Sequence, residues 1–387
     1  MKHHEKLPVI SLLALTVSGF IAIITETLPA GLLPQISSGI GVSEAYAGQF
    51  ITLYALGSVL SAIPVISWTR NWNRKPLLLL AVAGFFVFNL TTFFLQSYYL
   101  LLAVRFMAGV SAGIIWGLLT GYTIRMVSPE LAGKALAIVG VGQPIALSLG
   151  VPLATWLGGT IGWATIFLII AILSLIVLFW IIFLVPDFSV EQKTESTPFN
   201  AVFSNKKIQK ILFITLFWIL AHNLLYTYIA PYLTAKDLVN QIDWVLLLFG
   251  LFSILGIWLT GLWIDKHLQK LVLINLGLFV FAGVLLWFGN SNSTVILMGI
   301  AMWGYSFGGA PILLQKDLAD VAKENVDIAQ SIFVTVFNLA VAGGGLLGGV
   351  LLEYLGVNYI LIALVLLTLV AFAVVNFDRI HTQSLSK

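Results

Sequence analysis

Long apolar segments alternate with short polar intervals along the whole chain. Each apolar segment contains about 20 residues, the length at which an α-helix crosses the ~30 Å hydrocarbon core of a membrane. Twelve such segments are present, at about 8–32, 45–67, 76–95, 98–121, 134–156, 161–185, 210–233, 243–264, 270–289, 294–315, 327–351 and 355–376. The pattern therefore predicts an all-α membrane protein with twelve transmembrane helices.

The basic residues orient these predicted helices. Of the 19 Lys and Arg residues, seventeen lie in or beside the intervals on the side of the amino terminus, and the opposite intervals contain only Lys236. Positive charge is concentrated in cytoplasmic intervals. We therefore expect a multi-pass protein of the cell membrane, plasma or inner, with both termini in the cytoplasm.

Composition favours this class and excludes others. The chain is 60% hydrophobic and 9% charged, whereas a soluble domain has about 25% charged residues. The net charge of +3 is small, so no nucleic-acid partner is expected. The absence of cysteine excludes disulfides, thiolate catalysis and iron–sulfur clusters. Since the sequence also has no phosphate-binding loop, HExxH motif or carboxylate cluster, we expect neither an enzyme nor a cofactor or metal site.

The longest polar interval divides the predicted helices into six and six. It lies at 187–209, and its composition is that of a linker. We therefore expect an N-terminal six-helix bundle at 1–186, a cytoplasmic linker at 187–209 and a C-terminal six-helix bundle at 210–387.

The two halves resemble each other weakly. Glu26 lies eight residues before Pro34, and Asn223 lies eight residues before Pro231, in corresponding first segments. Internal symmetry of this kind is typical of transporters that work by alternating access. Chance similarity between apolar helices is the alternative explanation for a single matching interval.

Two charged residues lie deep inside apolar segments. Glu26 is in the segment 8–32 and Arg105 in the segment 98–121. A lone charge in hydrocarbon costs at least ~2.5 kcal/mol, so each needs a partner, a proton or a water-filled cavity. Counting residues along the helices places both in the outer half of the membrane. They form either a static buried salt bridge, which contributes little to stability, or a proton-coupling pair.

Polar and aromatic side chains within the predicted helices mark candidate substrate contacts. We assign this role to Trp116, Gln143, His222, Asn223, Tyr226, Tyr305 and Asn338. His222, Asn223 and Tyr226 share one helical face. A histidine at mid-membrane can carry a proton, contact a solute or serve as a structural group. The amides can likewise bind a solute or bridge two helices.

Small residues and prolines mark candidate hinge and packing positions. Gly109 and Gly113 share a helical face with Arg105, and glycines let helices approach closely. The segment 134–156 contains Pro144, Gly150 and Pro152, and proline bends a helix. A kinked helix that only packs is the alternative to a hinge.

The polar interval GLWIDKHLQK follows the segment 243–264. Its Asp265 can accept hydrogen bonds from a helix terminus, while Lys266 and Lys270 face the cytoplasm. Ordinary orienting charge explains both lysines equally well.

Taken together, these motifs resemble the major facilitator superfamily over essentially the whole chain. The similar pieces are TETLPAGLLPQIS, RFMAGVSAGIIWGL, LGVPLATWLG, AHNLLYTYIAPYL and FVTVFNLAVAGGGLLGG. Within that family they are similar to the drug/proton-antiporter-like branch, which includes sugar, arabinose and purine nucleoside efflux permeases. The resemblance implies two pseudo-symmetric six-helix bundles around a central cavity that opens alternately to each side.

The resemblance also implies roles for individual residues. Arg105 with Gly109 and Gly113 looks like the motif associated with proton coupling, and the run around Pro144 to Pro152 looks like the antiporter motif. Asp265, Lys266 and Lys270 look like the loop motif that latches the two halves. In the first half, Arg70 stands where that motif has its aspartate.

These observations predict a monomeric secondary transporter that exports a small organic solute, such as a drug, sugar or nucleoside, in exchange for a proton. Burial and a neighbouring cation act in opposite directions on the proton affinity of a carboxyl group. Relative movement of the helices can therefore cause Glu26 to bind and release a proton. Proton-linked uptake, facilitated diffusion and, less favoured, a membrane sensor or enzyme remain the alternatives.

Overall fold

The computed structural model describes residues 7–69, 72–188, 202–289 and 292–384, and these residues contain no β-strand. Most of the expected linker at 187–209 lies outside the described residues, as does Arg70. Within the described part, ten helices are long and apolar enough to cross a membrane. One of them, Val239–Phe288, contains two of the predicted segments, and the predicted segment 45–67 corresponds to the further helix Glu44–Trp68. The prediction of an all-α protein with twelve transmembrane helices is therefore confirmed.

The chain forms two compact units. Unit 1 contains Met1–Val42 and Gln49–Thr194, and unit 2 contains Ser43–Gly48 and Glu195–Lys387. The first residues of one long helix, Glu44–Trp68, are thus grouped with unit 2.

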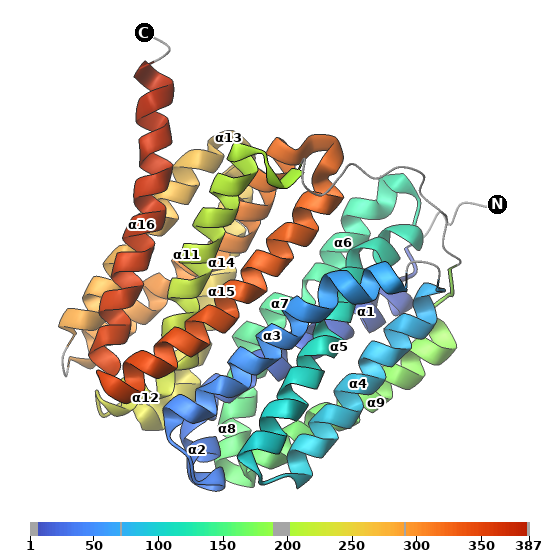
Figure 1. Ribbon diagram of the computed structural model, residues 1–387, viewed down its shortest axis with the longest axis horizontal. Helices are drawn as coiled ribbons and strands as arrows, with labels where there is room; N and C mark the ends of the chain where they lie inside the picture. The colour runs from blue at the N-terminus through green and yellow to red at the C-terminus, as the bar shows by residue number, and fades with distance from the viewer. Residues whose placement is uncertain (1–6, 70–71, 189–201, 290–291, 385–387) are drawn as a thin grey trace. The chain divides into compact units, whose positions relative to one another are not determined.

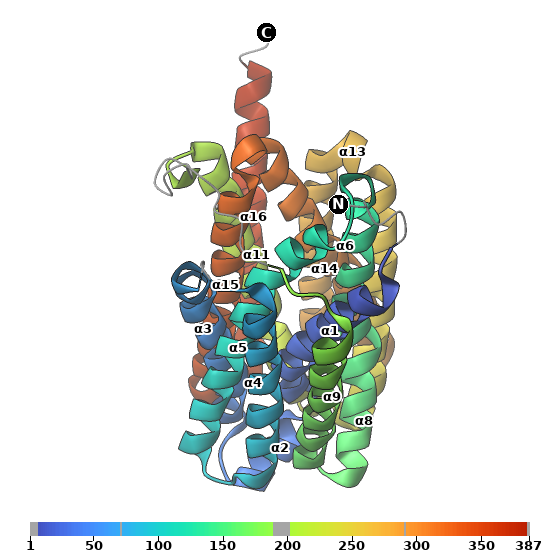
Figure 2. The same cartoon turned by 90° about the vertical axis from the view of Figure 1, so that its right-hand side faces the viewer.

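Unit 1 is a bundle of six long helical segments (Figure 1). Its elements are α1 (Val9–Gly31), α2 (Leu33–Ile40), α3 (Glu44–Trp68), α4 (Arg74–Phe94), α5 (Tyr98–Arg125), η1 (Pro129–Leu131), α6 (Ala132–Gly140), α7 (Gly142–Ile145), the π-helical turn η2 (Ala146–Gly150), α8 (Val151–Ile161) and α9 (Trp163–Leu184). Figures 1 and 2 show α4 beside α5 and α9. Helix α1 packs against α5, α6 and α9, so its polar residues are enclosed by neighbouring helices.

Unit 2 is built from the remaining helices (Figure 1). They are α11 (Lys206–Thr227), α12 (Ile229–Thr234), η3 (Val239–Gln241), α13 (Ile242–Phe288), α14 (Ser293–Ala322), η4 (Lys323–Asn325), α15 (Val326–Tyr354) and α16 (Val357–Ser384). Helix α13 packs along α14, and α11 packs against α15 and α16.

Two boundaries differ from those expected from the sequence. The predicted segments 243–264 and 270–289 are two helices that meet directly at a kink at His267 (φ −134°, ψ 26°) without an intervening loop, and α13 includes both. The predicted segment 210–233 is instead divided at Tyr228 into α11 and α12. Hydropathy does not detect either feature, since a kink changes backbone direction without changing polarity.

The first helix of each unit breaks in the same way. Helix α1 ends at Gly31 and is followed by the non-helical residue Leu32 (φ −108°, ψ 13°), and α11 ends at Thr227 and is followed by the non-helical residue Tyr228 (φ −112°, ψ 29°). A short helix follows each break, with Pro34 near the start of α2 and Pro231 near the start of α12. Proline is favoured in the first turn of a helix because amides there have no intrahelical acceptor.

A second repeated feature is the close approach of two helices through glycines. In unit 1, a Cβ on Gly57 or Gly109 would collide with a carbonyl oxygen of the facing helix. In unit 2 the same holds for Gly256 and Gly308, with the same spacing between the two glycines. The units are therefore pseudo-symmetric in packing as well as in helix order.

Candidate functional site

Glu26 and Arg105 lie in one buried cluster of unit 1, on α1 and α5. Glu26 is 7% exposed and Arg105 is fully buried. Their charges interact electrostatically, yet no guanidinium nitrogen hydrogen-bonds to the Glu26 carboxylate. The two charges are therefore neighbours without forming a hydrogen-bonded salt bridge in this structure.

Arg105 is held by a backbone carbonyl and two aromatic rings. Its Nη2 donates to the carbonyl of Thr25, the residue before Glu26. The rings of Tyr54 and Phe167 each lie with their centroids 5.2 Å from the guanidinium carbon, within the range of a cation–π interaction. Nε and Nη1 have no hydrogen-bond partner among the described residues. The cation thus keeps unused donors beside the buried carboxylate.

Two further side chains donate to the same stretch of α1. Tyr54 Oη of α3 donates to the carbonyl of Ala22 at 2.7 Å. Asn89 Nδ2 of α4 donates to Thr25 Oγ1 at 3.2 Å. Three helices therefore supply donors to α1 within one helical turn. We call Thr25, Glu26, Tyr54, Asn89 and Arg105 the charged cluster.

Reasoning from the sequence missed Tyr54, Asn89 and Phe167. Asn89 carried a usable indication, because it is an amide within the apolar segment 76–95 and a buried amide needs partners. Tyr54 and Phe167 carried none, since aromatic residues are common throughout the chain.

The expected packing glycines of α5 position Arg105. A Cβ on Gly109 would collide with the carbonyl of Tyr54, and one on Gly113 would lie 2.6 Å from the carbonyl of Ser58. The close approach of α5 to α3 brings the Tyr54 ring to the guanidinium. Trp116, further along α5, is half-buried.

The expected hinge segment contains a change of helix type. Residues Ala146–Gly150 form a π-helical turn between α7 and α8, and Ser148 Oγ donates to the carbonyl of Pro144 at 2.6 Å. A Cβ on Gly150 would lie 3.0 Å from the Phe20 ring of α1. Such turns are frequent at functional sites. Pro152 lies in the first turn of α8, and Gln143 is half-buried.

His222 of unit 2 lies among aromatic rings. Its ring stacks on Phe307 with centroids 3.3 Å apart and planes at 3°. Tyr226, Trp303 and Phe249 have ring centroids 5.3, 5.4 and 5.8 Å from that of His222. We call these five residues the aromatic cluster.

The hydrogen bond within the aromatic cluster defines the form of the imidazole. Trp303 Nε1 lies 3.1 Å from His222 Nδ1. An indole nitrogen can only donate, so Nδ1 must accept and cannot carry a proton. In this arrangement His222 is therefore a neutral imidazole with its proton on Nε2, and protonation would require the Trp303 bond to break.

The other expected contact residues of unit 2 lie apart from this bond. Asn223 and Asn338 are 8% and 6% exposed, and each amide donates to the carbonyl four residues earlier, Ile219 and Val334. Their amide oxygens therefore remain the groups that can meet a solute. Tyr305 is half-buried on α14.

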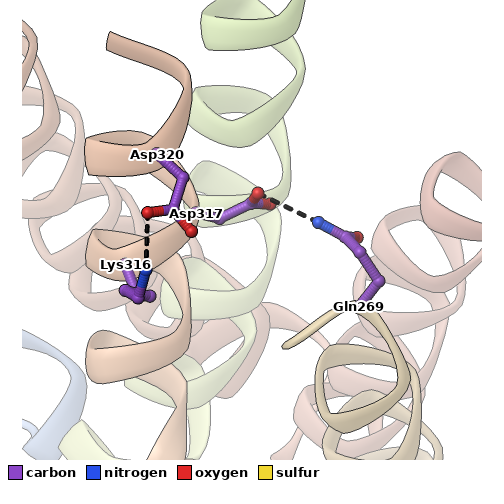
Figure 3. Close-up of polar contacts among 4 residues, drawn as sticks. All are labelled: Gln269, Lys316, Asp317 and Asp320. Atoms are coloured by element: carbon purple, nitrogen blue, oxygen red, sulfur yellow. Dashed lines mark hydrogen bonds and ion pairs between the residues drawn. The ribbon is translucent and has the colours of Figure 1, made fainter. Parts of the chain in front are cut away.

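The expected cytoplasmic residues Asp265, Lys266 and Lys270 are exposed on α13. Near them, Gln269 Nε2 of α13 donates to Asp317 Oδ1 of α14 at 2.9 Å (Figure 3). Lys316 pairs with Asp320 at 2.5 Å, and Asp265 interacts electrostatically with Lys316. Gln269 and Asp317 were not identified from the sequence. Within the described residues, no group of three His, Asp or Glu side chains can hold a metal ion.

The chain is similar to known proteins in both sequence and structure. The family model of the Major Facilitator Superfamily matches residues 15–325 and 239–384. The chain is 29% identical over 340 residues to an uncharacterized MFS-type transporter, YbcL, of Bacillus subtilis (strain 168), with 86% of each chain covered. It is 24% identical over 333 residues to a probable sugar efflux transporter of Pasteurella multocida (strain Pm70), covering 86% of this chain and 82% of the relative.

Two solved structures have the same fold. The human organic anion transporter MFSD10 (TETRAN) matches 96% of this chain and 100% of its own, with a TM-score of 0.70 and 17% identity. The nucleoside transporter NupG matches 94% of this chain and 98% of its own, with a TM-score of 0.75 and 12% identity.

Proposed function

Because the chain belongs to the Major Facilitator Superfamily, we propose that it exports a small organic solute across the cell membrane in exchange for a proton. It is a multi-pass membrane transporter. In the proposal both termini are cytoplasmic, as the distribution of basic residues indicates. The protein acts as a monomer, and alternating exposure of a central site moves the solute outward.

The observation that carries the proposal is the state of Glu26. Glu26 is 7% exposed, and its carboxylate makes no hydrogen bond to Arg105. An acid that lies in hydrocarbon without a fixed partner is costly unless it exchanges a proton or meets water or a solute. Glu26 is therefore the proposed proton carrier, and Arg105 is the neighbouring cation.

A single exchanged proton is sufficient for efflux. One elementary charge gains ~2.3 kcal/mol per 100 mV of membrane potential, which corresponds to about a fortyfold concentration ratio. Export is favoured over uptake because a relative is named a probable sugar efflux transporter.

The proposed solute is a sugar, a nucleoside or a similar drug-sized compound. The rings of the aromatic cluster are buried against one another in this structure, each residue at most 7% exposed. In the proposal they stack on a ring of the solute when the site opens. His222 of the cluster is neutral in the observed arrangement, and Asn223 and Asn338 offer amide oxygens. These groups suit a solute with hydroxyl or amino donors rather than a strongly acidic one.

The test uses the purified full chain in sealed vesicles that enclose a pH-sensitive dye. Thermal-shift measurements with sugars, nucleosides and lipophilic cations first select a stabilising compound. We then expect wild-type protein to concentrate that compound against its gradient when an opposing proton gradient is imposed, with proton movement in the opposite direction.

The variant Glu26→Gln is expected to exchange the compound down its gradient but not to concentrate it. Asp237→Asn is the matched control, because Asp237 is exposed and its φ of 58° is a conformation that asparagine adopts readily. Accumulation by Glu26→Gln would show that the proton carrier is wrongly assigned. Solute flux without proton flux in wild type would indicate facilitated diffusion instead.

A further inference from the structure

The hydrogen bond that holds Arg105 depends on a carbonyl that a proline leaves free. In an α-helix the amide of residue 29 donates to the carbonyl of residue 25. Pro29 lies inside α1 and has no amide hydrogen, so it cannot supply this bond. The Thr25 carbonyl therefore has no donor in its own helix and is available to a donor from another helix.

Arg105 supplies that donor. Its Nη2 reaches the Thr25 carbonyl from α5, and both residues are completely buried. A buried carbonyl without a hydrogen-bond partner destabilises the fold. Arg105 therefore supplies the hydrogen bond that the helix lacks, and the carbonyl supplies an acceptor for the buried cation.

We propose that Pro29 is the positioning residue of the charged cluster, because it frees the Thr25 carbonyl that anchors Arg105 beside Glu26. This inference rests on the proposed function in assigning the anchored cation to proton coupling. The anchor is a neutral backbone group, so Arg105 stays attached to α1 whether Glu26 is charged or protonated. Only the Glu26 carboxylate then changes partners during transport.

The rest of the charged cluster is consistent with this anchoring. Asn89 donates to the hydroxyl of Thr25, and Tyr54 donates to the carbonyl of Ala22. Both therefore bind α1 without using the Glu26 carboxylate. Unit 2 offers the contrast, since α11 contains no internal proline before Tyr228 and α14 has no buried arginine.

The experiment is a double-mutant cycle on the thermal unfolding of the purified full chain in detergent. Arg105→Met removes the donor, and Pro29→Ala restores the amide that can bond to the Thr25 carbonyl. We expect the change in unfolding temperature caused by Arg105→Met to be at least halved in the Pro29→Ala protein, because neighbouring groups that share a partner are not additive. Equal changes in the two backgrounds would overturn the proposal.

The matched control is Pro64→Ala in α3. This is a second proline inside a helix of unit 1, about 15 Å along α3 from Tyr54. Arg105→Met should have its full wild-type effect in that background. A reduced effect there as well would mean that loss of any helix kink, rather than the freed carbonyl, produces the coupling.

A second measurement leaves Pro29 unchanged and so does not depend on the folding of its variants. Arg105→Lys keeps a donor that can reach a carbonyl, whereas Arg105→Met does not. We expect the unfolding temperature of Arg105→Lys to fall by at most half as much as that of Arg105→Met. Equal decreases for the two variants would contradict the proposal that the Thr25 carbonyl anchors Arg105. Neither measurement involves a proton gradient or a solute, so failure of the anchor is distinguishable from failure of proton-coupled export.

Discussion

The two units share the same arrangement of helices but enclose different side chains. Each begins with a helix that breaks before a short proline-containing helix, and each packs two helices through paired glycines. Unit 1 encloses the charged cluster, with an acid and a guanidinium. Unit 2 encloses the aromatic cluster, in which a neutral imidazole accepts a hydrogen bond from an indole.

This difference shows that the arrangement of the helices does not by itself determine the function of a unit. Glycine contacts and helix breaks decide how closely backbones approach, which is a matter of shape. The residues at a small number of positions then decide whether the interior of a unit contains charged side chains or aromatic rings. In the proposed function, unit 1 exchanges the proton and unit 2 supplies most of the surface for the solute.

The largest expected effect on stability comes from disrupting the glycine contacts between helices that both units share. Gly109→Ala and Gly308→Ala each place a Cβ against a carbonyl oxygen of the facing helix. Overpacking of this kind costs roughly 1–3 kcal/mol, and more where backbone must move. We expect both variants to unfold at clearly lower temperature, by similar amounts, in thermal-shift measurements.

Gly121→Ala and Gly261→Ala are the controls for this pair. A Cβ at either position meets nothing within 4 Å, so both should unfold like wild type. A large loss for Gly109→Ala with none for Gly308→Ala would contradict the equivalence of the two glycine contacts.

An intermediate effect sharpens the contrast at the aromatic cluster. Trp303→Phe removes the donor to His222 and leaves a buried nitrogen unpaired, which costs about 1–3 kcal/mol. Trp218→Phe removes an equally buried indole whose Nε1 has no partner among the described residues. We therefore expect Trp303→Phe to lower the unfolding temperature more than Trp218→Phe. Equal losses would show that ring volume matters and the hydrogen bond does not.

The smallest effect concerns charges that lie at the surface. Lys316 and Asp320 form an ion pair with side chains 37% and 50% exposed, and exposed pairs contribute little because water screens them. Lys316→Met should leave both the unfolding temperature and solute accumulation unchanged. A loss of accumulation comparable to that of Glu26→Gln would mean that functional charge is not confined to the buried cluster of unit 1.

Some features of the site followed from local sequence alone. Glu26 and Arg105 could be identified because a charge in a long apolar segment is unusual wherever its helix packs. The free carbonyl of Thr25 is also implicit in the spacing to Pro29, although its use was not foreseen. Gln269 and Asp317 could not be identified, since both lie in polar surroundings where such residues are ordinary.

What the sequence by itself determined is the number and type of spans and the position of each charge along its own helix. Length and polarity decide these, because hydrocarbon admits only helices whose backbone bonds are internal. The tertiary structure alone decided that Arg105 bonds to Thr25 rather than to Glu26, that Asn89 and Tyr54 join them, and that Trp303 faces His222. These pairings depend on how each helix is rotated and how closely it approaches its neighbours. An apolar pattern that is hydrophobic on all sides leaves that rotation undefined.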